Sequence, residues 1–257
     1  MISIISIINN DVIAKEFLLS GLSRQNTHYD LILLDNKDSS YRSAAQAYNE
    51  GSAKAKGDYL MFIHQDVLLP CRNWLKEAEN SLSTVSNLGI AGVAGMLQPT
   101  FISDFEVLAR FHLLEKLNLS KVWYYRYGRG NVFHGLEKKP WLGKCTSEVI
   151  STRTLDELLL IIPARVFANS KFDETTCDNW HLYGVDYSLS ASQKGRDVCV
   201  LPYSVVHLAY VRKLDNGYFK TLVKLIEKYQ TEKIINTTLG PWSTRPRLME
   251  LQSRRFL

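Results

Sequence analysis

The sequence predicts an α/β fold in which a mixed, mainly parallel sheet is covered by helices on both faces. Three observations support this class. Short apolar runs alternate with helix-like segments along residues 1–98. The runs are apolar throughout rather than at every second position, which is typical of strands buried on both faces of a sheet. With 257 residues and 46% hydrophobic composition, the chain can also bury a sizeable core.

The first 98 residues contain four expected strands with three helices between them. The strands are expected at residues 3–9, 29–35, 59–66 and 89–95, where runs such as "YDLILLD" are almost wholly apolar. The helices are expected at residues 12–25, 40–55 and 71–85, where apolar residues recur at helical spacing. A helix between successive strands allows these strands to run parallel.

The rest of the chain is less regular. Ser103 and Glu106 form a capping box that predicts a helix over residues 103–117. The aromatic, basic and glycine-containing residues 121–144 predict no regular element. The elements expected after them are a strand and turn at 155–167, a helix starting near Asp186, a strand at 196–209 and an amphipathic helix from Asn216. One face of the last helix carries Phe219, Leu222, Val223, Ile226 and Tyr229.

Composition excludes several classes of protein. Charged residues make up 22% of the chain, which is typical of a globular and not of a disordered protein. The four cysteines (Cys71, Cys145, Cys177 and Cys199) form no CxxC motif, so we expect reduced thiols in a cytosolic protein rather than a zinc site or disulfides. No apolar run is long enough to span a bilayer, and the N-terminal segment has the pattern of a strand rather than a signal peptide.

The net charge of +5 is concentrated near the C-terminus. Residues 212–257 hold ten Lys and Arg against four Asp and Glu, a net charge of +6, so the rest of the chain carries −1. This balance argues against a nucleic-acid-binding core and indicates that the C-terminal segment meets an anionic surface such as a membrane. The alternative is that the amphipathic helix packs its apolar face on the preceding domain.

One short stretch places ionisable residues inside an apolar context. In "DYLMFIHQDVLLP", His64, Gln65 and Asp66 separate two apolar runs. A lone carboxylate there is unfavourable unless it is paired or holds a metal ion. Asn9 and Asp35 also stand at strand ends. Ligands of such sheets bind at the carboxyl ends of the strands, so we expect these side chains to converge on one crevice.

Three stretches in order resemble a known family. They are "LILLDNKDSS", "AAQAYNEGSAKAKGDYLMFIHQDV" and "LDELLLIIPARVF…FDE…WHLYGVDYSLSASQKGRDVCVLP…H". Together they resemble the GT-A glycosyltransferases of the large family 2 type, and their spelling is similar to a bacterial subgroup with HQD in place of DxD. The resemblance implies a GT-A catalytic domain over residues 1–211, made of a nucleotide-sugar-binding half (1–98), a variable acceptor region (99–154) and an acceptor and catalytic half (155–211). A basic, amphipathic extension (212–257) follows.

The same resemblance implies a divalent cation, Mn²⁺ or Mg²⁺, held by Asp66 and His207. Such an ion acts as a Lewis acid on the diphosphate of a sugar nucleotide. His64 stands where the family has the first Asp of its DxD motif, which lowers the negative charge of the site. For either histidine taken alone, a hydrogen-bonded structural role is the alternative.

The resemblance also implies which side chains contact the nucleotide sugar: Asn9, Asp35, Asp38, Asn49, His64, Gln65 and Asp66. Two alternatives remain open. Asp38 is placed to cap the helix expected from near Tyr41. Asn49 precedes Gly51, a residue that commonly ends a helix.

Asp186 matches the carboxylate that acts as general base in inverting members of the family. The alternative role for Asp186 is that of a helix N-cap. The resemblance places Asp156, Glu157, Trp180 and His181 on the acceptor side, with core packing as the alternative for Trp180. An aromatic and basic cluster outside the resemblance forms either an acceptor loop or a packed subdomain; it comprises Trp123, Tyr124, Tyr125, Arg126, Tyr127 and Arg129.

These features predict an inverting, metal-assisted glycosyltransferase, of hexosyltransferase type, in bacterial polysaccharide or glycoconjugate synthesis. It would move a sugar from a nucleotide-sugar donor, with UDP favoured, to a glycan or lipid-linked acceptor. It would be cytoplasmic, with peripheral contact at the inner face of the plasma membrane as a further expectation. A non-catalytic binder of sugar nucleotides or glycans is one alternative, because His64 replaces an acidic residue. A sugar-nucleotide pyrophosphorylase is another, although "SIINNDVIAK" lacks the glycines that such an enzyme needs there.

Overall fold

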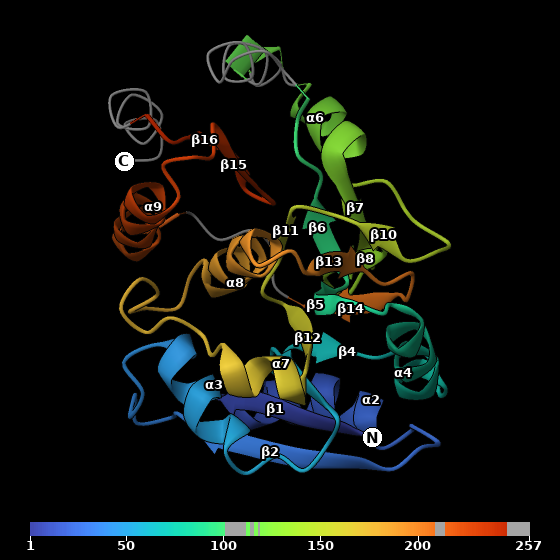
Figure 1. The fold of residues 1–257 in the computed structure, drawn as a ribbon. Coiled ribbons are helices and arrows are strands. Elements are labelled where there is room, and N and C mark those ends of the chain that lie inside the picture. Colours follow the sequence, from blue (N-terminus) through green and yellow to red (C-terminus); the bar gives the residue numbers. More distant parts are fainter. Residues whose placement is uncertain (101–111, 114–115, 118, 209–213, 246–257) are drawn as a thin grey trace.

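A mixed seven-stranded sheet lies at the centre of the molecule (Figure 1). The computed structural model describes residues 1–100, 112–113, 116–117, 119–208 and 214–245. The strands are β1 (Ile2–Ile8), β2 (Tyr29–Asp35), β3 (Tyr59–Ile63), β4 (Val67–Leu68), β5 (Leu88–Gly92), β6 (Ala94–Met96), β7 (Gly128–Gly130), β8 (Val132–His134), β9 (Lys139–Pro140), β10 (Ile150–Ser151), β11 (Thr154–Leu155), β12 (Leu159–Pro163), β13 (Asp197–Val200), β14 (Val205–His207), β15 (Ile234–Thr237) and β16 (Gly240–Ser243). The helices are α1 (Asp11–Ala14), the π-helical turn η1 (Lys15–Leu19), α2 (Ser20–Leu22), α3 (Ala44–Ser52), α4 (Trp74–Thr84), α6 (Ser120–Tyr127), α7 (Ala164–Asn169), α8 (Tyr183–Gln193) and α9 (Asn216–Lys228).

The strand order of the central sheet is β10-β13-β5-β12-β3-β1-β2. β1 pairs in parallel with β2 and β3, and β13 pairs in parallel with β5. β12 lies between β3 and β5 and is antiparallel to both, and β10 is antiparallel to β13 at the edge. The prediction of a mixed, mainly parallel sheet is therefore confirmed.

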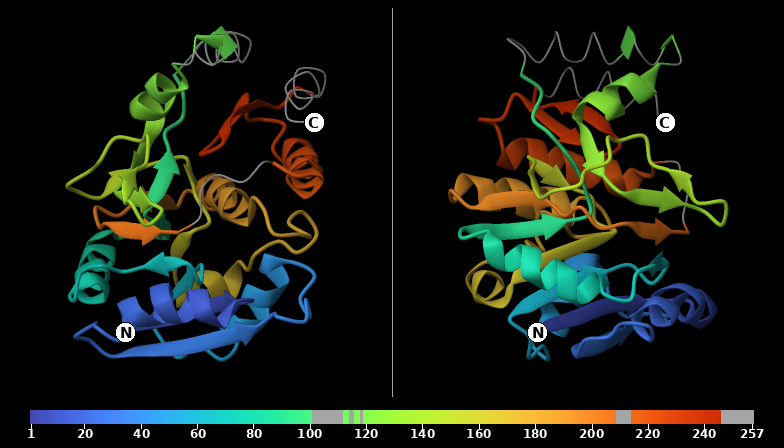
Figure 2. Two further views of the ribbon diagram at one scale, coloured as in Figure 1. Left: turned by 180° about the vertical axis from the view of Figure 1, so that it is seen from behind. Right: turned by 90° about the vertical axis from the view of Figure 1, so that its right-hand side faces the viewer.

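Helices cover both faces of the sheet at its middle strands, which explains why β3 is apolar throughout. Along β3, Met61 and Ile63 pack into one core with α2 and α4, whereas Leu60 and Phe62 pack into a second core with α3, α7 and α8. Successive side chains of a strand point to opposite faces, so both sets of side chains are buried in a strand that is covered on both faces. The two opposite views show these helical layers in turn (Figures 1 and 2).

The N-terminal end of α3 corrects one sequence prediction. The helix expected at 40–55 begins at Ala44, and its N-cap is Ser43, whose Oγ accepts a hydrogen bond from Gln46 N at 3.1 Å. The capping role offered for Asp38 is therefore wrong. Nor does α3 end at Gly51, because it continues to Ser52. A Cβ at Gly51 would lie 2.8 Å from Ile5 Cγ2, so the glycine allows the helix to approach the sheet closely.

Residues 121–144 also differ from the prediction, since they contain α6, β7, β8 and β9. Trp123 and Tyr127 lie four residues apart on α6 and are buried beside Met96 and Ile234. The local sequence does not predict β7 and β8, because the strands that they pair with, β6 and β14, lie far away in the sequence. The single strand expected at 196–209 is likewise two strands, β13 and β14, in different sheets. The helix predicted at 103–117 lies largely outside the described residues.

The amphipathic helix α9 packs on α8. Phe219, Leu222 and Ile226 form a core with Val185 and Leu189 of α8. This confirms that the apolar face of α9 packs within the molecule. Val223, which the sequence pattern assigned to the same face, is 38% exposed. Among the described residues, no helix combines the length and apolar character needed to cross a bilayer.

The packing of α9 gives a test with two adjacent residues. Leu222 is fully buried and Val223 is 38% exposed. We expect Leu222→Ala to lower the free energy of unfolding by about 2–5 kcal/mol, because it leaves a cavity in a packed core. Val223→Ala should change it by less than about 0.5–1 kcal/mol. Urea unfolding followed by circular dichroism measures both, and equally small effects would contradict the packing of α9 on α8.

Candidate active site

A cavity of about 450 Å³ opens at the carboxyl ends of β1 and β3. It gathers most of the side chains that the sequence singled out. The predicted residues on its wall are Asn9, His64, Gln65, Asp66, Asp156, Glu157, Trp180, His181 and His207. Asp35, Asp38, Asn49 and Asp186 are not among its lining residues. The expectation that strand-end residues converge thus holds for Asn9 and Asp66.

Two strand ends bring His64, Asp66 and His207 together. His64 and Asp66 follow β3, and the pairing of β4 with β14 sets Val67 opposite His207. His207 Nε2 lies 3.4 Å from Asp66 Oδ2. One ligand atom from each of the three residues falls within 4.8 Å of the others. Atoms bound to one divalent ion lie roughly 3–4 Å apart, so small side-chain rotations would let this group hold a metal.

The protonation states of His64 and Asp66 suit a metal site. Burial lowers the pKa of His64, which favours a neutral imidazole with a free lone pair. Burial alone would raise the pKa of Asp66, but the hydrogen bond and charge of His207, with a smaller effect of His64, bring it down to about 2. A metal ion binds neutral imidazole and ionised carboxylate, so these are the forms that ligation requires.

Gln65 joins the ends of the two strands. Its Oε1 accepts hydrogen bonds from Asn9 N and Asn10 N, both at 3.0 Å, and its Nε2 donates to Asn9 Oδ1. The side chain of Asn10 in turn caps α1. Gln65 therefore fixes the loop that carries the metal-ligating candidates on either side of it.

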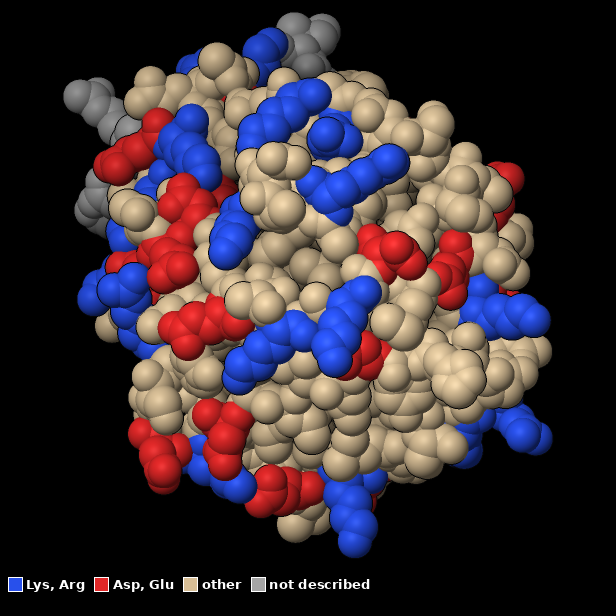
Figure 3. All heavy atoms as spheres, turned by 60° about the horizontal axis from the view of Figure 1, so that its bottom comes forward, with Lys and Arg blue, Asp and Glu red and all other residues tan. Residues whose placement is uncertain are grey.

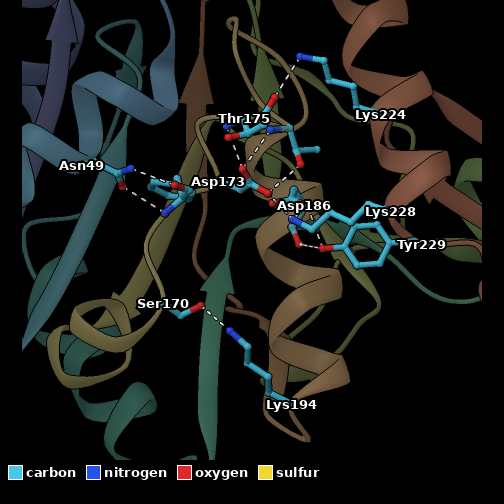
Figure 4. A network of polar contacts seen from close by, with 11 residues as sticks. Asn49, Ser170, Asp173, Thr175, Asp186, Lys194, Lys224, Lys228 and Tyr229 are labelled. Carbon is cyan, nitrogen blue, oxygen red and sulfur yellow. Dashed lines mark hydrogen bonds and ion pairs between the residues drawn. The ribbon is translucent and has the colours of Figure 1, made fainter.

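The other predicted nucleotide contacts lie away from the cavity wall. Asp35 is exposed, and it accepts hydrogen bonds from Lys37 N at 3.0 Å and pairs with Lys37 Nζ at 3.2 Å. Asp38 is exposed as well. Asn49 is buried, and both polar atoms of its side-chain amide form hydrogen bonds. Its Nδ2 donates to Phe172 O at 2.9 Å and its Oδ1 accepts from Phe172 N (Figure 4). The same Nδ2 also donates to Glu174 Oε1 at 3.0 Å. Its amide connects α3 to the 172–174 loop.

Asp186 belongs to a buried ionic network (Figure 4). It is 3% exposed, and its Oδ1 accepts from Lys228 Nζ at 2.7 Å and from Tyr229 Oη at 2.9 Å. Lys228 also pairs with Asp173 at 2.8 Å. Burial raises the pKa of Asp186, although Lys228 and Tyr229 oppose this shift. The N-cap alternative is wrong, because α8 begins at Tyr183 and its N-cap is Leu182, in the left-handed conformation with φ of 65°.

The cavity wall that carries Asp156, Glu157, Trp180 and His181 is acidic and aromatic. Asp156 Oδ1 accepts from Leu158 N at 3.1 Å, and Asp156 Oδ2 accepts from Thr238 Oγ1 at 2.5 Å. Trp180 lines the cavity and is 41% exposed, so it is not a core residue. His181 lies 3.2 Å from Asp215, which caps α9.

The sequence matches the model of the "Glycosyltransferase like family" over residues 3–229. The chain belongs to this family. A search among curated proteins finds no significant match.

Solved structures of glycosyltransferases share the fold of this family member. Mannosyltransferase PcManGT from Pyrobaculum calidifontis, in complex with GDP-Man and Mn²⁺, matches with a TM-score of 0.54 at 12% identity over 90% of this chain and 64% of its own. GalNAc-T7 with UDP, GalNAc and Mn²⁺ matches with a TM-score of 0.59 at 14% identity over 88% and 47%. S. aureus TarS matches with a TM-score of 0.53 at 11% identity over 88% and 39%. The fold is therefore GT-A, and the chain spans less than two thirds of each of these proteins.

Several cavity residues of this glycosyltransferase-like chain were not predicted from the sequence. His134 lies beside His207 because β8 and β14 pair in register, with ring centroids 5.5 Å apart. Tyr183 opens α8, and its Oη lies 3.2 Å from His64 Nε2. Thr238 and Leu239 come from the turn between β15 and β16. Only Tyr183 stood within a motif of the sequence; His134 is placed by the pairing of β8 with β14, and Thr238 contacts the cavity wall through its hydrogen bond to Asp156.

The aromatic and basic cluster on α6 is mainly a packed element. None of its six members lines the cavity, and Trp123 and Tyr127 are buried. Val132, His134 and Trp141, which follow α6, do reach the cavity. Of the two alternatives, an acceptor loop or a packed subdomain, the burial of Trp123 and Tyr127 supports the packed subdomain.

Glu157 has the most perturbed carboxyl group on the cavity wall. Burial, followed by the negative charge of Asp156, raises its pKa to about 8. The folded state therefore keeps a proton on Glu157 between about pH 5 and pH 8, where the unfolded chain has lost it. The stabilising contribution of this proton to the free energy of unfolding is complete at low pH and is lost as the pH rises towards 8.

Glu157→Gln should remove that pH dependence. In metal-free buffer with EDTA, we expect the melting temperature of the wild type, relative to the variant, to fall steadily from pH 5 to pH 8. The measurement is thermal unfolding of both proteins across this range, with the exposed Glu227→Gln as a matched control. A constant difference between the wild type and Glu157→Gln would show that Glu157 titrates normally.

Proposed function

We propose that this protein is an inverting glycosyltransferase that moves a sugar from a nucleotide-sugar donor, with a UDP-sugar favoured, to a hydroxyl group of a glycan or lipid-linked acceptor. One observation carries the proposal: a single cavity joins a candidate metal group (His64, Asp66 and His207) to an acidic and aromatic wall. The first part suits a diphosphate and the second suits sugar hydroxyls and rings.

The donor side would hold Mn²⁺ or Mg²⁺ through Asp66, His207 and His64. The bound ion would supply Lewis-acid stabilisation of the charge on the leaving diphosphate. Two of the three ligands are imidazoles, which suit Mn²⁺ better than Mg²⁺, since Mg²⁺ prefers oxygen ligands. The complexes of PcManGT and GalNAc-T7, whose fold is similar, contain Mn²⁺.

The chain's own residues would position the donor and the acceptor. Gln65 holds the loop after β3 against the start of α1. The exposed ring of Trp180 offers a face on which an acceptor sugar can stack. Asp35 and Asp38, at the carboxyl end of β2, remain candidates for the nucleoside, which would extend beyond the cavity towards that edge. Asp156 and His181 would hydrogen-bond sugar hydroxyls.

The acceptor need not be brought in by α9. The apolar face of α9 is buried, and Lys224 and Lys228 pair with Asp178, Asp173 and Asp186. On the face shown in Figure 3, basic and acidic side chains are interspersed, without a continuous basic surface for a nucleic acid.

The two alternative functions differ in what the cavity must do. A pyrophosphorylase needs a phosphate-binding loop after the first strand, but here α1 starts at Asp11 directly after its cap, Asn10. A non-catalytic binder would keep the donor site without turnover. The next experiment distinguishes such a binder from an enzyme.

A panel of nucleotide sugars tests the proposed function. With Mn²⁺ present, a matching donor at about 100 times its Kd should add about 2.7 kcal/mol to the stability of the folded state. UDP-sugars should give larger thermal shifts than GDP-sugars. The best donor, mixed with candidate glycans and lipid-linked saccharides, should then release its nucleoside diphosphate. Binding without release on any acceptor would favour the non-catalytic binder.

Metal dependence is tested on the donor site alone. We expect calorimetry to show donor binding that is stronger in Mn²⁺ than in Mg²⁺ and weakest in EDTA. Asp66→Ala should abolish this dependence, because it removes the charged ligand. Asp35→Ala is the matched control: it lies outside the cavity wall and should weaken binding equally with and without metal. Equal donor affinity in EDTA and Mn²⁺ would contradict the metal assignment.

A further inference from the structure

We infer that Glu157 is the residue that removes the proton from the acceptor hydroxyl, and that Asp186, the base expected from the sequence, is a structural residue. This inference rests on the proposed function and assigns its central catalytic group. It follows from which carboxylates face the cavity and which are already engaged.

The carboxylates on the described part of the cavity wall have different partners. Asp66 is paired with His207. Asp156 accepts hydrogen bonds with both oxygens, from Leu158 N and Thr238 Oγ1. Glu157 Oε1 is buried and has no hydrogen-bond partner among the described residues. A buried acceptor without a partner is unfavourable and calls for an explanation, and an incoming hydroxyl group would provide the missing donor.

Asp186 is engaged elsewhere. Its Oδ1 accepts from both Lys228 and Tyr229, and the residue is not part of the cavity wall. To take a proton from an acceptor, it would have to give up its contacts with Lys228 and Tyr229 and move towards a cavity whose wall it does not reach. The network instead holds α9 against α8 (Figure 4).

Gly184 makes room for Glu157 at the start of α8. A Cβ at Gly184 would lie 3.2 Å from Glu157 Cγ and 3.4 Å from its Oε1. The carboxyl group therefore lies against the first turn of the helix, where the N–H groups of Gly184 and Val185 favour its ionised form. Burial and Asp156 act in the opposite direction, and the resulting pKa of about 8 makes Glu157 a stronger base than an ordinary carboxylate.

The position also suits the reaction. Tyr183 Oη donates to Glu157 O at 3.3 Å and lies 3.2 Å from His64 Nε2, so a single side chain separates Glu157 from the donor side. In the step, Glu157 takes the hydroxyl proton while the acceptor oxygen forms a bond to the anomeric carbon. The bond from that carbon to the diphosphate oxygen breaks, and its electron pair leaves with the nucleoside diphosphate. Glu157 then returns the proton to solvent.

Four titratable groups lie near enough to interact electrostatically with the Glu157 carboxyl. Asp156 precedes it in the chain, Tyr183 belongs to α8, Tyr218 belongs to α9 and Cys177 lies on the loop before α8. Burial raises the pKa of each of Tyr183, Tyr218 and Cys177, so these three stay neutral over the working range. Asp156 is therefore the charge among these four that acts on Glu157 directly.

The test compares two isosteric substitutions. Glu157→Gln and Asp186→Asn are assayed with the nucleotide sugar that gives the largest thermal shift, Mn²⁺ and an acceptor that the wild type uses. Glu157→Gln should lower kcat by about 10²–10⁴-fold, the usual contribution of a positioned base. The donor Kd, measured by calorimetry, should stay unchanged. Its remaining activity should also lose the rise towards pH 8 that the wild type shows.

Asp186→Asn should keep kcat within a few-fold of the wild type while lowering the melting temperature. If the single variant does not fold, Asp186→Asn combined with Lys228→Met removes both charges of this pair, so that neither is left without the other. A kcat for Glu157→Gln within a few-fold of wild type overturns the inference. So does a loss of 100-fold or more in a folded Asp186 variant that binds donor normally. Wild-type protein that binds donors but transfers to no acceptor overturns the proposed function itself, and the two failures are thereby distinguished.

Discussion

The antiparallel pairing of β12 with β3 is the constraint on which the active site depends. β3 ends at Ile63, opposite Leu159, the first residue of β12, and His64 N donates to Leu158 O at 3.0 Å. Because the strands run in opposite directions, the residues that precede β12 lie beside those that follow β3. The metal-ligating candidates and the acceptor carboxylates, about 90 positions apart in sequence, thus share one cavity. A parallel β12 would have placed them at opposite ends of the sheet.

The C-terminal segment completes this site from the side. Thr238 donates to Asp156, and Asn236 donates to Leu97 O and accepts from Trp123, so the β15–β16 hairpin is tied to the domain by polar contacts. The Asp186–Lys228 pair attaches α9 through charges that are costly to bury but more costly to separate. These contacts explain why a segment that the sequence describes as a basic extension contributes to the cavity wall.

The histidines change the chemistry of the site without removing its capacity for metal. A neutral imidazole at His64 replaces a charge, yet it remains a ligand that Mn²⁺ accepts. The loss of negative charge beside Asp66 also reduces repulsion of the incoming diphosphate. On the other wall, Glu157 occupies the space that Gly184 leaves open.

The sequence by itself predicted the four strands and the intervening helices of the N-terminal half, because these depend on local periodicity, and it singled out the end of β3, because a carboxylate interrupts an apolar run there. His207 was predicted only through the resemblance to the family, and the structure brings it together with His64 and Asp66. Tertiary structure alone decided which acidic residues face the cavity. In the sequence Glu157 precedes a strand and Asp186 lies near a helix start, and neither pattern shows which carboxylate is already paired; contacts with Lys228 and Tyr229 engage Asp186. Such contacts join residues that lie tens of positions apart in the sequence, so no local sequence pattern predicts them.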